Sequence, residues 1–266
     1  MIDCIQNSSS DRMPLMFVGH GNPMNAIVDN TFSRTWREIG KTLPNPRAIL
    51  SISAHWITPE TTMVTAMTRP KTIHDFGGFP NELYQVEYPS PGAPEAAQAT
   101  QDAVTRVPIA LDQDWGLDHG TWSVLLPMFP AADIPVYQLS IDYGQPAEFH
   151  YEIGQQLRAL REQGVLIMGS GNLVHNLRRV RFDGGPPYDW AIEFDAIMAK
   201  AIQDGDHRTA IEFQKLGALA QMAHPTYDHF LPLLYVLGAT DPNEQPEFFN
   251  SDFDFGSASM RSMIYR

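Results

Sequence analysis

Four short apolar runs, separated by stretches with helical spacing, constrain the fold of this chain more than any other feature. Each run has four or five apolar residues followed by small or polar ones, as expected for a strand buried on both faces. The runs lie at residues 14–21, 47–56, 134–142 and 164–172. The helical stretches lie at residues 30–43, 93–106, 147–164, 189–206, 207–221 and 227–238. This alternation predicts an α/β fold with a central, largely parallel or mixed sheet flanked by helices on both faces.

The chain shows no internal repeat and no linker rich in glycine, serine or proline, so we expect one domain. Residues 1–13 are predicted to form a flexible polar tail, and residues 14–266 a single α/β domain. Residues 257–266 are expected to add a late strand. The one cysteine, Cys4, lies in the tail, which excludes an internal disulfide and a cysteine-ligated zinc site.

The charge balance restricts the partners of this protein. Lys and Arg number 18 against 31 Asp and Glu, which gives a net charge of −13. Such a surface repels nucleic acid and anionic membranes, so neither is expected as a partner. The chain lacks an apolar stretch long enough to cross a bilayer, and its tail lacks the apolar centre of a signal peptide. We therefore expect a cytoplasmic protein that is a monomer or a small homo-oligomer.

Three histidines fall where an expected strand gives way to a loop. His20 and His55 close the runs at 14–21 and 47–56, and His175 follows the run at 164–172. In parallel α/β sheets, ligands bind outside the carboxyl ends of the strands. We therefore predict that these three side chains face one ligand-binding edge.

Two more histidines are predicted to join that edge. His229 should lie in the first turn of the helix at 227–238, where the helix dipole keeps imidazole neutral and able to ligate a metal. His119 lies in the glycine-flanked segment "GLDHGTW". The long loop at 69–94 is rich in aromatic residues, glycine and proline, which is typical of functional loops. Surface or capping roles are expected for His74, His150, His207 and His224, and His74, which belongs to this loop, is also a candidate to face the same edge.

A metal site built from imidazoles is the chemistry that these residues favour. Imidazole ligands suit iron, zinc, copper or nickel, and they do not suit calcium or magnesium. Several other sites are excluded by motif. "GHGNP" lacks the lysine of a phosphate-binding loop, "MGSGN" lacks the first glycine of a nucleophile elbow, and no H-E-x-x-H occurs.

Six ordered motifs identify a family. They are "GHGNPMN", "SAHW", "TIHDFGGFP", "GLDHGTW", "SGNLVHN" and "HPTYDHFLPLLYVLGA", and they span nearly the whole chain from residue 14 onward. Together they resemble the class III extradiol ring-cleaving dioxygenases of the LigB superfamily, and within it the 4,5-DOPA extradiol dioxygenase group. The resemblance implies a catalytic domain that uses dioxygen to open the ring of a catechol such as L-DOPA to a semialdehyde.

The resemblance also implies roles for individual residues. His20, His55 and His229 would hold a non-haem Fe(II), and zinc would be able to fill the same site in purified protein. His175 would act as acid and base and is also a candidate fourth ligand, while His119 would orient the substrate.

The wall that receives the substrate's side chain is predicted at His74, Asp75 and Phe76. A zinc hydrolase or amidase using metal-activated water is the alternative, because the same ligands serve that chemistry.

Overall fold

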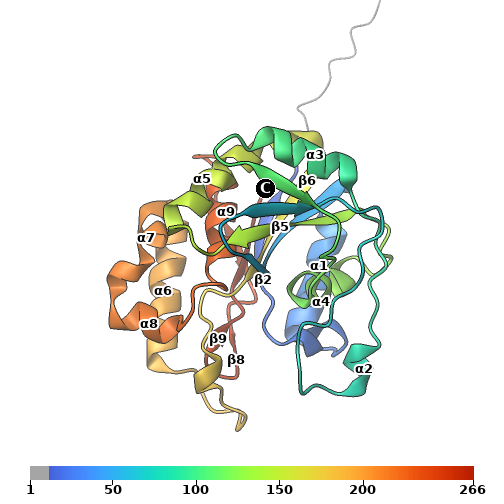
Figure 1. Ribbon diagram of the computed structural model, residues 1–266. Helices are drawn as coiled ribbons and strands as arrows, with labels where there is room; N and C mark the ends of the chain where they lie inside the picture. The colour runs from blue at the N-terminus through green and yellow to red at the C-terminus, as the bar shows by residue number, and fades with distance from the viewer. Residues whose placement is uncertain (1–11) are drawn as a thin grey trace, which may run out of the picture.

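The computed structural model describes residues 12–266, so residues 1–11 of the expected tail lie outside the described part of the chain. The centre is an eight-stranded mixed sheet in the order β4-β3-β5-β2-β6-β1-β10-β7 (Figure 1). Its strands are β1 (Leu15–Gly19), β2 (Ala48–Thr58), β3 (Thr62–Thr65), β4 (Ile109–Asp112), β5 (Val136–Asp142), β6 (Val165–Gly171), β7 (Glu247–Phe249) and β10 (Ser262–Tyr265). A small antiparallel pair, β8 (Phe253–Asp254) and β9 (Ala258–Ser259), stands apart from it.

The four predicted runs form the middle of the sheet. They are β5, β2, β6 and β1, which lie side by side and pair in parallel. Their neighbours at both edges are antiparallel, because β3 pairs with β5 and β10 pairs with β1 in that sense. The prediction of a largely parallel or mixed sheet is therefore confirmed, and the late C-terminal strand is β10.

Both faces of the central strands are buried, which explains why their sequences are apolar throughout. In β1, Leu15 and Phe17 point into one hydrophobic core, and Met16 and Val18 point into a second core on the other face. Side chains alternate between the faces of a strand, so a strand covered on both sides needs apolar residues at every position.

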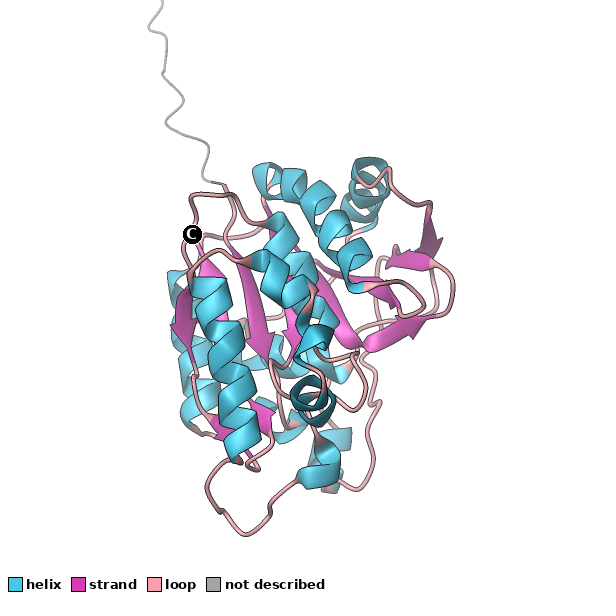
Figure 2. Cartoon of the chain, turned by 90° about the vertical axis from the view of Figure 1, so that its left-hand side faces the viewer, coloured by secondary structure: helices cyan, strands magenta, loops and turns pink. Residues whose placement is uncertain are grey.

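Helices cover the two faces separately. One core includes residues of α3 (Pro94–Ala103), α5 (Ala147–Leu157), α6 (Asp189–Gln203), α7 (His207–Ile211), α8 (Ala218–Ala223) and α9 (Leu231–Ala239). Figure 2 shows several of these helices in front of the strands. The other face carries α1 (Thr31–Thr42) and α4 (His119–Met128), and α2 (Asn81–Tyr84) lies in the long loop beyond them. The expected helix-sheet-helix layering is thus present.

Several element bounds differ from the predictions. The stretch 147–164 is α-helical only to Leu157 and continues as a 3-10 helix (Arg158–Gln163), and the helix expected at 227–238 begins at Leu231. Strand β2 does not end at His55 but continues to Thr58, and its pairing with β5 shifts register between Ile52 and Ile57. Such irregularities re-aim side chains and are common beside active sites. The segment 207–221, expected as one helix, divides into α7, a 3-10 turn (Phe213–Leu216) and α8, because Gly217 adopts a φ of 60° between them.

Two observations concern the limits of the folded body. Met13 is buried, and its N–H donates to the carbonyl of Arg161 at 3.2 Å. Within residues 12–266, no helix has the length and apolar character that crossing a membrane requires.

Candidate metal centre

Five histidines gather in a cavity of about 510 Å³ at the carboxyl ends of β1, β2 and β6. They are His20, His55, His119, His175 and His229. Residues of the β8–β9 hairpin and of the loop that carries α2 also line this cavity. The structure therefore brings together all five histidines that the sequence placed at this edge of the sheet.

Three of these imidazoles converge on one point. Potential ligand atoms of His20, His55 and His229 all lie within 4.8 Å of one another, and the Nε2 atoms of His20 and His55 are 3.2 Å apart. His20 follows the end of β1, and His55 lies in the irregular part of β2. His229 lies in the turn two residues before α9, so the expectation that it lies in the first turn of that helix is wrong; the helix begins only at Leu231, with Pro232 in its first turn.

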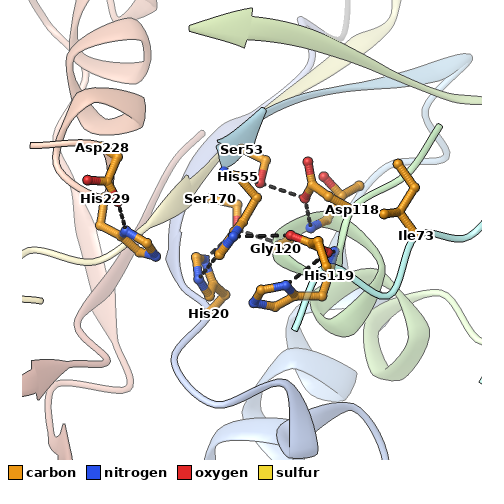
Figure 3. A network of polar contacts seen from close by, with 12 residues as sticks. His20, Ser53, His55, Ile73, Asp118, His119, Gly120, Ser170, Asp228 and His229 are labelled. Atoms are coloured by element: carbon orange, nitrogen blue, oxygen red, sulfur yellow. Dashed lines mark hydrogen bonds and ion pairs between the residues drawn. The ribbon is translucent and has the colours of Figure 1, made fainter. Parts of the chain in front are cut away.

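Each of the three rings is oriented through its Nδ1 atom. The Nδ1 of His20 lies 3.0 Å from Ser170 Oγ, that of His55 lies 3.2 Å from Asp75 Oδ2, and that of His229 pairs with Asp228 (Figure 3). Histidines that bind metals are commonly held in this way, because an oxygen on one ring nitrogen sets the tautomer and turns the other nitrogen to the metal.

The tautomers follow from these partners. The hydroxyl of Ser170 donates its one proton to the carbonyl of Gly120 at 2.5 Å, so it accepts from Nδ1–H of His20. The carboxylates of Asp75 and Asp228 likewise accept from His55 and His229. When the rings are neutral, all three Nε2 atoms carry lone pairs. The Nε2 atoms of His20 and His55 lie 3.2 Å apart, a distance at which two lone pairs repel unless a proton or a metal ion lies between them, and this donor set fits a metal ion.

One carboxylate, Asp75, links two of the five histidines. Its Oδ2 meets His55, while its Oδ1 lies 3.0 Å from Nδ1 of His119 and accepts the backbone N–H of His119 at 2.9 Å. This arrangement leaves Nε2 of His119 available to a ligand in the cavity. Burial lowers the pKa of His119, and the nearby His55 lowers it further.

Burial sets the charge state of the other rings. It lowers the pKa of His20 and His229 well below the usual histidine value, and it lowers that of His175 to about 4. His55 differs. Burial lowers its pKa, but hydrogen bonding to Asp75 and the nearby carboxylates raise the pKa by more, so the net shift is upward. For Asp75, burial raises the pKa, and its two histidine partners lower it by more. The cavity thus holds mostly neutral imidazoles beside an ionised carboxylate.

His175 stands next to the three converging rings. Its imidazole stacks on His229 with ring centroids 3.5 Å apart and an interplanar angle of 8°. Its backbone N–H donates to the carbonyl of Ala223 at 3.0 Å, and it forms an isolated bridge with Ala258 of β9. Its ligand atom also lies within 4.8 Å of those of Asp228 and His229, so the geometry places His175 beside the three converging rings both as a neighbouring base and as a candidate further ligand.

A buried network beneath the cavity was not anticipated. Asp118, fully buried, caps α4 and so places His119 in the first turn of that helix. Its Oδ1 accepts from Ser53 Oγ at 2.6 Å, and Ser53 Oγ accepts the backbone N–H of His55 at 3.2 Å. Gln138 donates to the other oxygen of Asp118 at 2.6 Å. The only sequence signal was the acidic residue directly before His119, as Asp228 directly precedes His229.

The predicted substrate wall divides into two parts. Asp75 and Phe76 line the cavity, and the ring of Phe76 meets that of His119 edge to face at 5.5 Å. His74 is not among the residues that line the cavity; its Nε2 lies 2.9 Å from the carbonyl oxygen of Val86.

Two histidines expected at the surface or in caps are instead fully buried. His150 bonds Tyr235 OH through Nδ1 at 2.9 Å, and His224 bonds the carbonyl of Leu173 through Nε2 at 2.8 Å. Burial of these two imidazoles is tolerated because each forms a hydrogen bond inside the core. His207 opens α7 and bonds Tyr151 OH at 3.1 Å, so it lies in the expected position.

Fold and site together define an α/β protein with an imidazole-rich cavity whose donor set fits a metal ion. Residues 13–261 match the family described as the catalytic LigB subunit of aromatic ring-opening dioxygenase. The chain belongs to this family, and it is an extradiol ring-cleavage dioxygenase.

Known relatives agree with this assignment. The chain is 47% identical over 261 residues to a 4,5-DOPA dioxygenase extradiol of Escherichia coli K12, covering 96% of this chain and 95% of the relative. It is 39% identical over 257 residues to the protein of the same name from Beta vulgaris, covering 92% and 94%. A crystal structure of an uncharacterized Escherichia coli K12 protein matches with a TM-score of 0.82 and 41% identity, covering 95% of this chain and 99% of that one. The family expected from the six motifs is confirmed, and the hydrolase alternative is not favoured.

Proposed function

We propose that this protein binds Fe(II) through His20, His55 and His229 and uses dioxygen to open the ring of a catechol such as L-DOPA to a semialdehyde. The observation that carries the proposal is the convergence of three imidazoles, with potential ligand atoms within 4.8 Å of one another and an oxygen close to each Nδ1. Membership of an extradiol dioxygenase family supports the reaction, and the names of the relatives support a substrate like DOPA.

A bound Fe(II) would supply the redox chemistry that joins dioxygen to a chelated catechol, and its charge would acidify the catechol hydroxyls. The chain's own residues then have separate tasks. His175 is neutral at physiological pH, since burial lowers its pKa to about 4, and it borders the centre through its stack on His229. It is therefore placed to accept a proton from a catechol hydroxyl and later to return it.

His119 and Phe76 position the ring. Nδ1 of His119 lies against Asp75 Oδ1 at 3.0 Å, so the ring presents its Nε2 to bond a substrate hydroxyl. Phe76, which lies edge to face with that imidazole, gives the aromatic ring an apolar contact. A cavity of about 510 Å³ lies within the usual size range of small-molecule sites.

Reconstitution tests the proposal. The protein is first loaded with Fe(II) under anaerobic conditions and then mixed with an air-saturated solution of L-DOPA. It should consume dioxygen and form a yellow ring-opened product whose mass shows two added oxygen atoms. Protein loaded with zinc is the matched control, because zinc fits the same ligands but cannot change oxidation state. Fully iron-loaded protein that consumes no dioxygen with L-DOPA, caffeate or protocatechuate would refute the assignment of activity.

A further inference from the structure

The outer wall of the cavity is apolar except for one carboxylate. It is formed by the β8–β9 hairpin and by the segment that follows β6. Leu177, Val180 and Phe255 line it, and Phe182 packs on Phe255 with ring centroids 5.5 Å apart. Leu177 and Phe182 are 65% and 86% exposed, which is unusual for side chains of this size. The carboxylate is that of Asp254, on β8.

Asp254 differs in its situation from the other acidic residue of the lining, Asp75. Asp75 is engaged with two histidines, whereas Asp254 has only the backbone N–H groups of Asn22 and Phe255 as hydrogen-bond partners, and it is half-buried. Burial raises the pKa of Asp254 above its usual value, so its charge is poorly solvated. No lysine or arginine occurs among the described residues that line the cavity. Arg178, Arg179 and Arg181 lie on the same segment but are not among the lining residues, and the guanidinium of Arg181 lies over the ring of Tyr188. Among the lining side chains, the charge of Asp254 therefore has no basic partner.

We propose that Asp254 determines specificity by binding a protonated amine on the side chain of the substrate. The preferred substrate class is then a catechol with a cationic chain, and a catechol whose chain carries only a carboxylate is disfavoured. This inference rests on the proposed function, because the catechol hydroxyls must lie at the histidine centre for the chain to reach the mouth.

Charge and surroundings both support this role. An ammonium-carboxylate hydrogen bond is stronger than a neutral one, and more so where the surrounding wall is apolar and partly excludes water. An anionic chain at the same place would meet Asp254 with like charge and would find no basic side chain among the residues that line the cavity. The wall of Leu177, Val180 and Phe255 would meanwhile contact the aliphatic part of either chain.

The test compares three catechols with chains of similar size and different charge: dopamine, neutral 4-ethylcatechol and anionic 3,4-dihydroxyphenylpropionate. Iron-loaded wild-type protein should have the lowest KM for dopamine. Asp254→Asn should raise the KM for dopamine about tenfold or more while leaving kcat and the KM for 4-ethylcatechol within about twofold. Asp254→Glu keeps the charge and should retain the preference. Asp252→Asn is the matched control, because Asp252 lies two residues away and is exposed.

Calorimetry on zinc-loaded protein separates this inference from the proposed function, since it measures binding without turnover. Tighter binding of dopamine than of 4-ethylcatechol, lost in Asp254→Asn and kept in Asp252→Asn, supports the subsite even if no catechol is cleaved. Equal affinities in the wild type, or an unchanged preference in Asp254→Asn, overturn it even if the ring is cleaved.

Discussion

His175 stacks face to face on His229, with ring centroids 3.5 Å apart and planes 8° from parallel. His229 is held on its other side by Asp228, and with His20 and His55 it completes a set of three imidazoles. His175 also forms a second group of potential ligand atoms with Asp228 and His229. The proposed division of roles, three ligands and one neighbouring base, is therefore a matter for substitution.

Substitution of His175 should separate catalysis from metal binding. We expect His175→Ala to keep most of its metal and to lose turnover by about a hundredfold or more, as for removal of a general acid-base residue. His20→Ala should lose the metal itself. Metal content after dialysis, followed by oxygen uptake, measures both effects. Equal metal loss in the two variants would instead make His175 a fourth ligand.

Asp75→Asn should weaken both metal binding and catalysis. The amide cannot accept from both His55 and His119 as the carboxylate does, because only one of its two polar atoms is an acceptor. Loss of such an orienting partner typically lowers metal affinity about 10- to 100-fold. Competition with a chelator measures this change. Glu82→Gln, an exposed acidic residue on the same loop, should behave as the wild type; a normal metal affinity in Asp75→Asn would contradict the orienting role.

The central strands and the histidine edge could be predicted from the sequence because each has a strong local signature. A strand buried on both faces must be apolar throughout, as β1 is, and the carboxyl end of a parallel strand is where ligands bind. His20, at the end of β1, and His175, just after β6, were therefore found without three-dimensional information.

Edge strands and orienting residues lacked such a signature. Strand β3 is four residues long and mixes threonine with apolar residues, so its sequence does not separate it from a loop. Ser170 and Asp118 act through contacts with residues 150 and 65 positions away, His20 and Ser53. Short polar residues of this kind are common in turns and caps, and only the tertiary fold shows which of them meet a ligand.

Acid should destabilise the protein through its buried histidines. Burial lowers the pKa of His150 to about 4 from an unfolded value near 6.5, so below pH 6.5 the unfolded chain binds the proton first. The contribution of this residue to stability is complete above about pH 6.5 and is lost as the pH falls towards 4, by about 2 kcal/mol between pH 7 and pH 5.

Urea unfolding of His150→Gln at these two pH values checks this expectation. The variant should lose less free energy of unfolding on acidification than the wild type, whatever its stability at pH 7. Tyr235→Phe removes the partner of His150 but keeps the titrating group, so its loss should match that of the wild type. An identical pH dependence in His150→Gln and wild type would show that His150 does not contribute.

The substitution Gly171→Ala should disturb the metal centre through the backbone of His229. A Cβ at this position, the last of β6, would lie 2.2 Å from the carbonyl oxygen of His229, which already accepts the N–H of Asn172 at 2.9 Å. That distance is a clash with backbone, so Gly171→Ala must push the segment of His229 away, at a cost of about 1–3 kcal/mol. Because His229 moves with its backbone, metal affinity should fall together with stability.

Gly144→Ala is the control, since a Cβ at Gly144 would have its nearest neighbour, Asp142 Oδ1, at an ordinary 3.5 Å. Chemical unfolding and chelator competition report the two effects, and a stable Gly171→Ala protein with unchanged metal affinity would show that the contact between β6 and His229 does not position the ligand.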